Sequence, residues 1–486
     1  MSNNIKDKAV SLEILKEVKD KLEEKIDSFN NVYVTPEQFG AIGDGVTDDF
    51  SAVQSALISG YPVKFTQTYL ITDIIRLSNS VEMFGNGKIV INGVKTLGFK
   101  FTECDGCTIK VNDITIEVTS DILPDNKQFM TFLVENCTCE LFEMNNVTIN
   151  LIGSISATVT HTRTIKNYKI TNCNFRNLTD NNLGGIFWFN SIVDVNAIIE
   201  NCRFEQNSAD EIIGLYGGTA DNKILGKINI QNCEFIKHNT TNQNRGFLFS
   251  MYSEYVEGYV KFENCSFLIE DRVSAFYCIE KNGHVIMDNC KIIGTPSDCL
   301  FFSRTYKSNN EADFILNNCT IETETNITGC NTESVINAKS NVKSPSNIRF
   351  NNCNIKCKMI SNISSYEKDR YSVVVELLNS NVVADVLIES IRKDTGNISV
   401  KDCVLDVREM FKNNSTNFIG SKVYQHNKIS TIGNNSQTNN IMNIDLVPVW
   451  TTNQYDSSKP NSVCFRFMND IKKLSFFDGE QFIELN

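Results

Sequence analysis

An Asn-Cys pair with apolar neighbours recurs along most of the chain and limits the folds open to it. The pair is clearest at residues 170–175, which read I-T-N-C-N-F. Successive paired cysteines lie 25 to 36 residues apart, a spacing typical of stacked structural repeats. The repeated cysteines are Cys137, Cys173, Cys202, Cys233, Cys265, Cys290, Cys319 and Cys353, with an Asp-Cys variant at Cys403.

The spacing of apolar residues around the pair predicts a bent β-chain. Cys173 and Phe175 are two residues apart and therefore share one face of a strand. Ile170 is three residues before Cys173, so both can point inward only if the chain bends between them. Asn172 lies at this bend, and Asn tolerates the left-handed conformation that a tight corner needs.

Short strands, a corner and a variable loop, once per repeat, describe one coil of a parallel β-solenoid. Stacking would place Asn on Asn, where amides can hydrogen-bond, and Cys on Cys, where thiols can fill the interior. The period alone also allows a helical repeat or a propeller. The β-branched content and the absence of a 3.6-residue stripe in these segments argue against helices.

Length and charge narrow the class of protein further. A solenoid can absorb 486 residues in one domain. The net charge of −12 disfavours nucleic acids and anionic membranes as partners. The first residues contain no apolar segment typical of a secretory signal, and no uncharged apolar stretch approaches 18 residues. We therefore expect no secretory signal and no membrane insertion.

The 17 cysteines are odd in number, and many occupy equivalent repeat positions. We therefore expect buried, reduced thiols in place of disulfides. The C-x-x-C of residues 104–107 has no second pair near it in the sequence, which favours a turn over a zinc site. Only four histidines are present, so we expect neither a metal nor another cofactor.

Residues 1–31 form a predicted N-terminal helical segment. Within it, steps of three and four residues separate the apolar side chains Leu15, Val18, Leu22, Ile26 and Phe29. The stripe could pack on the chain's own β-body or be buried by self-association. Because the helix precedes the body, we favour association.

Residues 39–57 contain three glycines within six residues, followed by Thr-Asp-Asp and an amphipathic pattern. This predicts a tight loop and a helix at 47–59 that covers the open end of the solenoid. Asp44, Asp48 and Asp49 could suggest catalysis, but turn and capping roles explain them more simply.

The same stretch resembles the N-terminal signature of the pectate-lyase-like superfamily, F-G-A-x-G-D-G-x-T-D-D-x-x-A-h-Q-x-A, at every fixed position from Phe39 to Ala56. The resemblance continues to about residue 93, and the Asn-Cys coils extend it to about 430. It implies an all-β, single-stranded right-handed parallel β-helix, which we expect to span residues 32–438. Lyases, hydrolases and phage tail proteins share the signature, so it predicts the fold more strongly than the function.

A further strand is predicted between successive Asn-Cys pairs. If the alternate apolar residues of these strands face inward, three aromatic residues face outward, where sugar rings can stack on them. Packing under a loop or against another subunit is the competing interpretation. The predicted outward residues are Trp188, Tyr216 and Tyr252. The predicted strands are 184–191, 211–218, 245–253, 274–282, 298–306, 333–340 and 371–379.

Four acidic residues beside these strands are the candidate catalytic groups, because a glycosidase needs two carboxyls about 5–9.5 Å apart. They are Asp210, Glu211, Glu254 and Glu280. Solvated surface acids are the simpler interpretation among 58 acidic residues. The Asn-Thr-Asp, Gly-His-Gly and Arg-x-Lys motifs of related hydrolases are absent from the sequence.

Residues 439–486 predict a small C-terminal β tip with short strands at 462–467 and 473–483. The segment resembles the end of many phage tail fibres and spikes, and a terminal hairpin is the alternative. By resemblance, we expect a homotrimeric phage-type tail fibre or tailspike that attaches to a bacterial surface polysaccharide. Its N-terminal helix would bind a tail or baseplate protein, and the protein would be located in a virion tail or a tail-like particle. A depolymerase on the same fold and a structural spacer are the alternatives.

Overall fold

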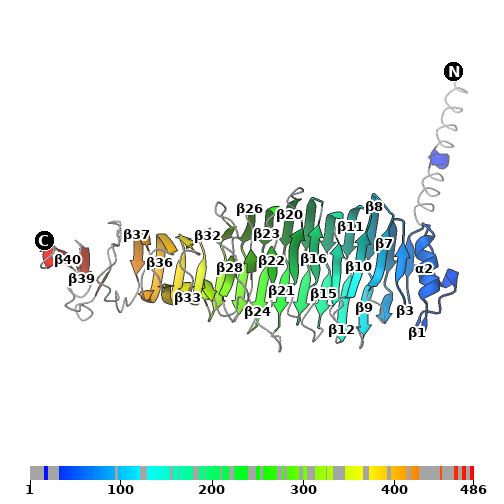
Figure 1. Ribbon diagram of the computed structural model, residues 1–486, viewed down its shortest axis with the longest axis horizontal. Helices are drawn as coiled ribbons and strands as arrows, with labels where there is room; N and C mark the ends of the chain where they lie inside the picture. The colour runs from blue at the N-terminus through cyan, green and yellow to red at the C-terminus, as the bar shows by residue number, and fades with distance from the viewer. Residues whose placement is uncertain are drawn as a thin grey trace, which may run out of the picture.

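The computed structural model shows an elongated rod of short strands with a helix at its N-terminal end (Figure 1). The structure describes residues 16–19, 32–92, 97–120, 129–153, 157–162, 164–178, 185–191, 193–207, 211–217, 224–238, 248–251, 256–270, 276–278, 282–294, 299–303, 312–324, 326–331, 345–364, 372–390, 396–412, 417–425, 449–450, 465–468, 473–477 and 482–485.

Through most of the rod each coil contains three strands, and each strand pairs in parallel with the strand three places later in the chain. For example, β14 pairs with β17, β15 with β18 and β16 with β19. The coils wind in the right-handed sense that parallel connections favour. The predicted right-handed parallel β-helix is therefore confirmed.

Three parallel sheets form the sides of the rod, and we name them by their place relative to the Asn corner. The sheet before the corner contains β2 (Val63–Phe65), β5 (Val81–Gly85), β8 (Cys107–Asn112), β11 (Cys139–Asn145), β14 (Ile165–Thr171), β17 (Val195–Glu200), β20 (Ile224–Gln231), β23 (Val256–Glu263), β26 (Asn282–Asp288), β29 (Ala312–Asn317), β32 (Pro345–Asn351) and β34 (Ser372–Leu378).

The sheet after the corner contains β1 (Asp44–Asp48), β3 (Thr68–Ile71), β6 (Lys88–Asn92), β9 (Thr115–Ser120), β12 (Thr148–Gly153), β15 (Asn174–Asn177), β18 (Arg203–Gln206), β21 (Glu234–Lys237), β24 (Ser266–Ile269), β27 (Lys291–Gly294), β30 (Thr320–Thr323), β33 (Asn354–Ser364) and β35 (Asn381–Ser390). The long strands β36 (Gly396–Lys412) and β37 (Asn417–Gln425) continue the stack.

The third sheet corresponds to the strands predicted between Asn-Cys pairs. It contains β4 (Ile75–Leu77), β7 (Leu97–Thr102), β10 (Phe129–Glu135), β13 (Ala157–Thr162), β16 (Phe187–Ser191), β19 (Ile213–Gly217), β22 (Phe249–Met251), β25 (Phe276–Cys278), β28 (Cys299–Ser303) and β31 (Asn326–Asn331). The predicted strand 333–340 lies outside the described residues.

The Asn residues form a ladder at one corner of the rod. From Asn172 to Asn352, the Asn of each Asn-Cys pair has φ between 53° and 55°, the left-handed conformation. The side-chain amide of Asn201 donates to Asn172 Oδ1 at 3.3 Å, and Asn232 and Asn264 each repeat this bond one coil further on. The predicted corner and its amide stack are confirmed.

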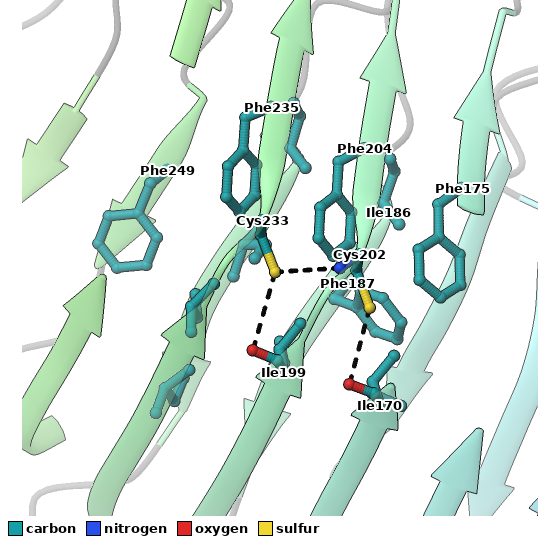
Figure 2. Packing of buried hydrophobic residues seen from close by; sticks show 14 of the residues in the cluster. Ile170, Phe175, Ile186, Phe187, Ile199, Cys202, Phe204, Cys233, Phe235 and Phe249 are labelled. Carbon is teal, nitrogen blue, oxygen red and sulfur yellow. Dashed lines mark hydrogen bonds between the residues drawn. The ribbon is translucent and has the colours of Figure 1, made fainter. Parts of the chain in front are cut away.

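The cysteines form a second ladder just inside this corner (Figure 2). The thiol of Cys202 donates to the carbonyl oxygen of Ile170 at 3.7 Å, and Cys233 donates to Ile199 at 3.8 Å. Each sulfur also accepts a backbone N–H from the preceding coil. The Cys173 nitrogen lies 3.4 Å from Cys202 Sγ, and the Cys202 nitrogen lies 3.4 Å from Cys233 Sγ. The thiols therefore satisfy buried backbone groups as well as filling space.

All 13 cysteines whose side chains the structure describes are buried and outside disulfides, which confirms the prediction for these residues. Burial raises the pKa of the Cys357 thiol to about 12. Phenylalanine rings stack beside the sulfur ladder. Phe204 lies 5.2 Å from Phe175 and 4.8 Å from Phe235, measured between ring centroids (Figure 2).

Two assignments within the repeat were wrong. Asn136-Cys137 lies between β10 and β11, one corner earlier than the Asn-Cys ladder, which passes between β11 and β12 in that coil. The predicted strand 371–379 contains β34 (Ser372–Leu378), which belongs to the sheet before the corner because Asn379-Ser380 is itself a corner. Ser380 replaces the cysteine there, and its hydroxyl accepts the N–H of Cys353 at 3.0 Å.

A helix lies within the range 47–59 predicted for the capping helix. The helix α2 spans Phe50–Ile58 and buries the predicted face of Val53, Ala56 and Leu57 at the N-terminal end of the rod (Figure 1). A short 3₁₀ helix, η1 (Pro36–Phe39), precedes it and contacts it. Of the predicted N-terminal helix 1–31, the structure describes residues 16–19, which are helical; the remainder lies outside the described residues.

Four short strands near the C-terminus form a separate sheet (Figure 1). They are β38 (Val449–Trp450), β39 (Phe465–Met468), β40 (Lys473–Phe477) and β41 (Phe482–Leu485). Among the described residues, no helix is long and apolar enough to cross a membrane.

Candidate functional site

The acidic residues of the N-terminal signature have structural roles. Asp44 Oδ1 accepts the backbone N–H of Val46 at 2.8 Å and of Thr47 at 2.7 Å. These hydrogen bonds hold the pKa of the Asp44 carboxyl below its usual value, and the one from the backbone N–H of Thr47 has the largest effect. Asp48 accepts the Thr72 hydroxyl at 2.6 Å.

Asp49 is buried and hydrogen-bonds to the backbone of the glycine-rich loop. Its two carboxylate oxygens accept the N–H groups of Ile42 at 2.7 Å and Gly43 at 3.1 Å. It precedes α2 as the N-cap residue but makes no side-chain capping bond. The expected turn role is confirmed for these aspartates, while the N-cap bonding expected of Asp49 was wrong.

Two of the three predicted aromatic residues, Trp188 on β16 and Tyr216 on β19, belong to the third sheet. Phe187 and Phe189 are fully buried on either side of Trp188 in the sequence. The backbone of Trp188 pairs with Gly214, and Tyr216 lies two residues further along β19, opposite Asn190. Trp188 and Tyr216 therefore occupy the same face of the sheet by register. Their side chains lie outside what the structure describes, as does all of Tyr252.

Of the four predicted acidic residues, the structure describes Glu211. Glu211 is half-buried and directly precedes the buried residues Ile212 and Ile213 at the start of β19. Asp210, Glu254 and Glu280 lie outside the described residues. Their grouping into a catalytic pair remains a prediction.

A charged cluster on the sheet after the corner was missed in the sequence. The carboxylate of Glu205 on β18 lies 3.2 Å from Arg176 Nε on β15 and 3.1 Å from His238 Nε2. His238 Nδ1 lies 3.0 Å from Glu270 Oε1, one coil further along. One imidazole ring thus joins two carboxylates from coils on either side of its own.

A second arginine enlarges this cluster. Arg203 Nη2 lies 3.6 Å from Glu205 Oε2, and Arg203 Nη1 also pairs with Glu234 on β21. The Glu205 side chain is only 16% exposed, whereas those of Arg203 and Glu234 are 43% and 47% exposed. The cluster therefore forms a polar patch with a half-buried centre. We call these six residues the Glu205 cluster: Arg176, Arg203, Glu205, Glu234, His238 and Glu270.

The electrostatics of the Glu205 cluster favour charged side chains. Burial raises the pKa of the Glu205 carboxyl, but hydrogen bonds from His238 and Arg176 outweigh it and hold the pKa below its usual value. Burial lowers the pKa of His238, but hydrogen bonds to Glu270 and Glu205 outweigh it and raise the pKa above 6.5. A glycosidase acid needs the opposite shift, a raised carboxyl pKa. The arrangement therefore suits ion pairing between coils more than proton donation.

The repeat itself contained the signal for this cluster. Arg176 and Glu205 each follow their ladder cysteine by three residues, and His238 and Glu270 follow theirs by five. Equivalent positions in a parallel stack lie directly above one another, about 4.8 Å apart. Aligning the coils on cysteine would have placed these charges together.

Among the side chains that the structure describes, no set of three or more His, Cys, Asp or Glu residues is arranged to hold a metal ion. The arrangement of polar groups in the Glu205 cluster can instead hydrogen-bond sugar hydroxyls through its exposed arginine and carboxylate groups. The fold around it is a right-handed parallel β-helix.

Comparison with known proteins gives matches at the level of structure. No protein family description matches the sequence, and no curated protein matches it. The tailspike protein gp49 of Pseudomonas phage LKA1 is 12% identical, with 82% of each chain covered and a TM-score of 0.46. Tailspike protein 3 of bacteriophage CBA120 is also 12% identical, with 94% of this chain and 68% of that chain covered and a TM-score of 0.44.

An enzyme appears among the similar structures as well. The endo-xylogalacturonan hydrolase of Aspergillus tubingensis is 12% identical, covering 81% of this chain and 99% of that chain, with a TM-score of 0.36. At these identities and TM-scores the likeness concerns architecture and does not distinguish attachment from catalysis.

Proposed function

We propose that the protein is a tail fibre or tailspike of a phage or a phage-tail-like particle, and that it attaches the particle to a bacterial surface polysaccharide. The observation that carries the proposal is the layout of the rod: a capped N-terminal end, a shaft of stacked coils, and a separate small sheet near the C-terminus (Figure 1). The N-terminal signature, which phage tail proteins share with lyases and hydrolases, is consistent with this assignment.

The proposed glycan-binding surface is the outer face of the third sheet. By register, Trp188 and Tyr216 share this face, and Tyr252 follows β22 on the next coil. Aromatic rings on such a face can stack against sugar rings while neighbouring polar groups bind hydroxyls. We call Trp188, Tyr216 and Tyr252 the aromatic strip, and binding of a glycan to it requires no cofactor.

Adsorption to host cells tests this proposal. The triple variant Trp188→Ala, Tyr216→Ala, Tyr252→Ala should lose most cell binding while keeping the circular dichroism and melting behaviour of the parent protein. Tyr61→Ala is the matched control, because Tyr61 is a 53% exposed tyrosine beside the N-terminal cap and belongs to no strand of the third sheet. Unchanged adsorption by the folded triple variant would reject the aromatic strip.

The assembly state is the second part of the proposal. A parallel homotrimer would bury the apolar stripe of the N-terminal helix, and Val18 in its described part is 56% exposed in the single chain. The helix would then bind a tail or baseplate protein. Light scattering after size exclusion should report a trimer, and removal of residues 1–31 should weaken it. A monomeric full-length protein would reject this part.

Depolymerase activity is the second candidate, favoured by the half-buried Glu211 at the start of β19. If the protein cleaves its glycan, purified polysaccharide should fall in mass, and Asp210→Asn, Glu211→Gln, Glu254→Gln or Glu280→Gln should slow that fall. Glu322→Gln is the matched control, since Glu322 pairs with Lys356 on another part of the rod. Unchanged polysaccharide mass would leave attachment alone. The third possibility is a structural spacer. Unchanged cell adsorption both after removal of residues 439–486 and in the triple aromatic variant would support it.

A further inference from the structure

Four cysteines meet at one corner near the N-terminal end of the rod. Cys104 and Cys107 flank the turn between β7 and β8, and Cys137 and Cys139 lie between β10 and the start of β11, one coil further on. All four are buried. The C-x-x-C that stands alone in the sequence forms the predicted turn between β7 and β8, and it gains cysteine neighbours from the next coil when the coils stack.

The sulfur atom of Cys104 lies between two other sulfurs. It is 3.3 Å from Cys107 Sγ and 3.2 Å from Cys137 Sγ. Neighbouring strands are about 4.8 Å apart, so these side chains approach one another more closely than stacking requires. A disulfide needs about 2.05 Å between sulfurs, which is about 1.2 Å less than the Cys104–Cys137 distance.

The contacts around the corner favour Cys137 over Cys107 as the partner of Cys104. The nitrogen of Gly106 donates to Thr138 O at 2.8 Å, and the nitrogen of Thr138 donates to Asp105 Oδ1 at 2.7 Å. These bonds fix the two turns against each other across the coils. Cys137 Sγ also has a long hydrogen-bond contact of 3.8 Å to Phe101 O, so its shortest polar contact described is the one to Cys104.

The two possible bridges differ in what they would do for the chain. A Cys104–Cys107 bond would close a turn that a 3.0 Å hydrogen bond from Cys107 N to Cys104 O already closes. A Cys104–Cys137 bond would span 33 residues and tie two coils together. The longer loop removes more entropy from the unfolded chain.

We propose that Cys104 and Cys137 are a redox pair: free thiols in a reducing medium, and an inter-coil disulfide in an oxidising one. The oxidant is a low-molecular-weight disulfide such as oxidised glutathione. One protein thiolate attacks it and releases one glutathione thiolate. The second protein thiolate then attacks the mixed disulfide, releases the second glutathione and closes the bond. Two electrons pass to glutathione, and the two protein thiol protons end on its thiolates.

The same geometry sets the rate of this reaction. Burial and the neighbouring thiols raise the pKa of Cys104, so little thiolate is present at neutral pH. Since the thiolate is the attacking species, closure should be slow near neutrality and faster as the pH rises. The proposal does not depend on the glycan-binding function, because it concerns the stability of the first coils.

Peptide mapping tests the pair directly. The full chain is purified in reductant, desalted, and incubated with oxidised glutathione at about pH 8.5, near the pKa of an ordinary thiol. Remaining thiols are then alkylated before digestion without reductant. We expect a linked pair of peptides carrying Cys104 and Cys137, with a mass two hydrogen atoms below the sum of the two peptides. We also expect hydrogen exchange, followed at increasing urea concentration, to show a higher unfolding midpoint for the N-terminal coils of the oxidised protein.

Three variants make the outcome specific. Cys107→Ser should keep the linked peptides, whereas Cys104→Ser should abolish them. Cys233→Ser, in the ladder, is the control for loss of a buried thiol. A Cys104–Cys107 link, no link after oxidation, or zinc retained by the four thiols in the purified protein would each overturn the proposal, and the mapping of the parent chain decides even if a variant fails to fold.

Discussion

The backbone N–H of Cys202 points at the sulfur of Cys233 in the next coil, with 3.4 Å between nitrogen and sulfur (Figure 2). The left-handed Asn201 before Cys202 turns the backbone at this corner, so the nitrogen of Cys202 faces along the rod. Cysteine at this position therefore does more than fill space, because its sulfur accepts a buried donor that an alkyl side chain would leave unpaired.

Substitutions of Cys202 should separate these two roles. Cys202→Ala should lower the free energy of unfolding by about 1–3 kcal/mol, because it leaves the N–H of Cys173 unpaired and opens a small cavity. Cys202→Ser should cost less, since Ser380 already accepts the equivalent N–H at 3.0 Å. Urea unfolding and amide exchange at Cys173 measure the difference. Equal losses in both variants would contradict the role of the sulfur as acceptor.

Substitutions of Asn201 should separate the backbone conformation from the amide ladder. Asn201→Ala should lower the free energy of unfolding by about 1–2 kcal/mol through the strained left-handed backbone alone. Loss of the side-chain hydrogen bonds to Asn172 and Asn232 adds to this. Asn201→Gly removes the same amide but tolerates φ of 55°. The glycine variant should therefore melt at the higher temperature of the two. The reverse order would contradict the requirement for a residue that tolerates the left-handed conformation at this corner.

Gly258 marks a place where two coils meet closely. A Cβ added there would lie 2.0 Å from the carbonyl oxygen of Gly226, and the residue has φ of 119°. Gly258→Ala should therefore cost about 1–3 kcal/mol for overpacking, plus backbone strain. Gly40→Ala is the control, since Gly40 has φ of 98° but nothing within 4 Å of its added Cβ. Similar melting temperatures for both variants would contradict the close contact.

The Glu205 cluster should make stability depend on pH. The folded state raises the pKa of His238 above 6.5, so the stabilisation is fully present below the unfolded value and is lost as the pH rises through the folded value. Urea midpoints measured from about pH 5.5 to 8.5 should fall across this range. His238→Gln should flatten that part of the profile, and His284→Gln serves as the control. If the urea midpoint of His238→Gln falls with pH as steeply as that of the parent protein, the Glu205 cluster does not cause the pH dependence.

Most of the fold could be predicted because each coil repeats the same physical problem. The parity of Ile170, Cys173 and Phe175 required a corner, and all three are buried as expected. The repeat prediction failed where another residue type occupies the cysteine position of an otherwise equivalent corner. Ser380 fills the cysteine position with a hydroxyl, so a search for Asn-Cys passed over its coil.

The candidate site was less predictable because it depends on which coils become neighbours. Arg176 and Glu205 are 29 residues apart in the sequence, and Glu205 and His238 are 33 apart, so only alignment of the coils brings them together. Asn136-Cys137 shows the converse problem, since the same dipeptide also suits a different corner. Local pattern therefore identifies a corner but not its place in the coil.

Because every Asn-Cys corner meets the next through the same backbone contacts, the coil acts as an interchangeable unit of length. The segment from Cys202 to Asn232 begins and ends at equivalent corners, so excising it would bring Cys233 against Asn201 with the same chemistry on both sides. The reach of such a shaft can thus be adjusted in steps of one strand spacing, about 4.8 Å, by gain or loss of whole coils.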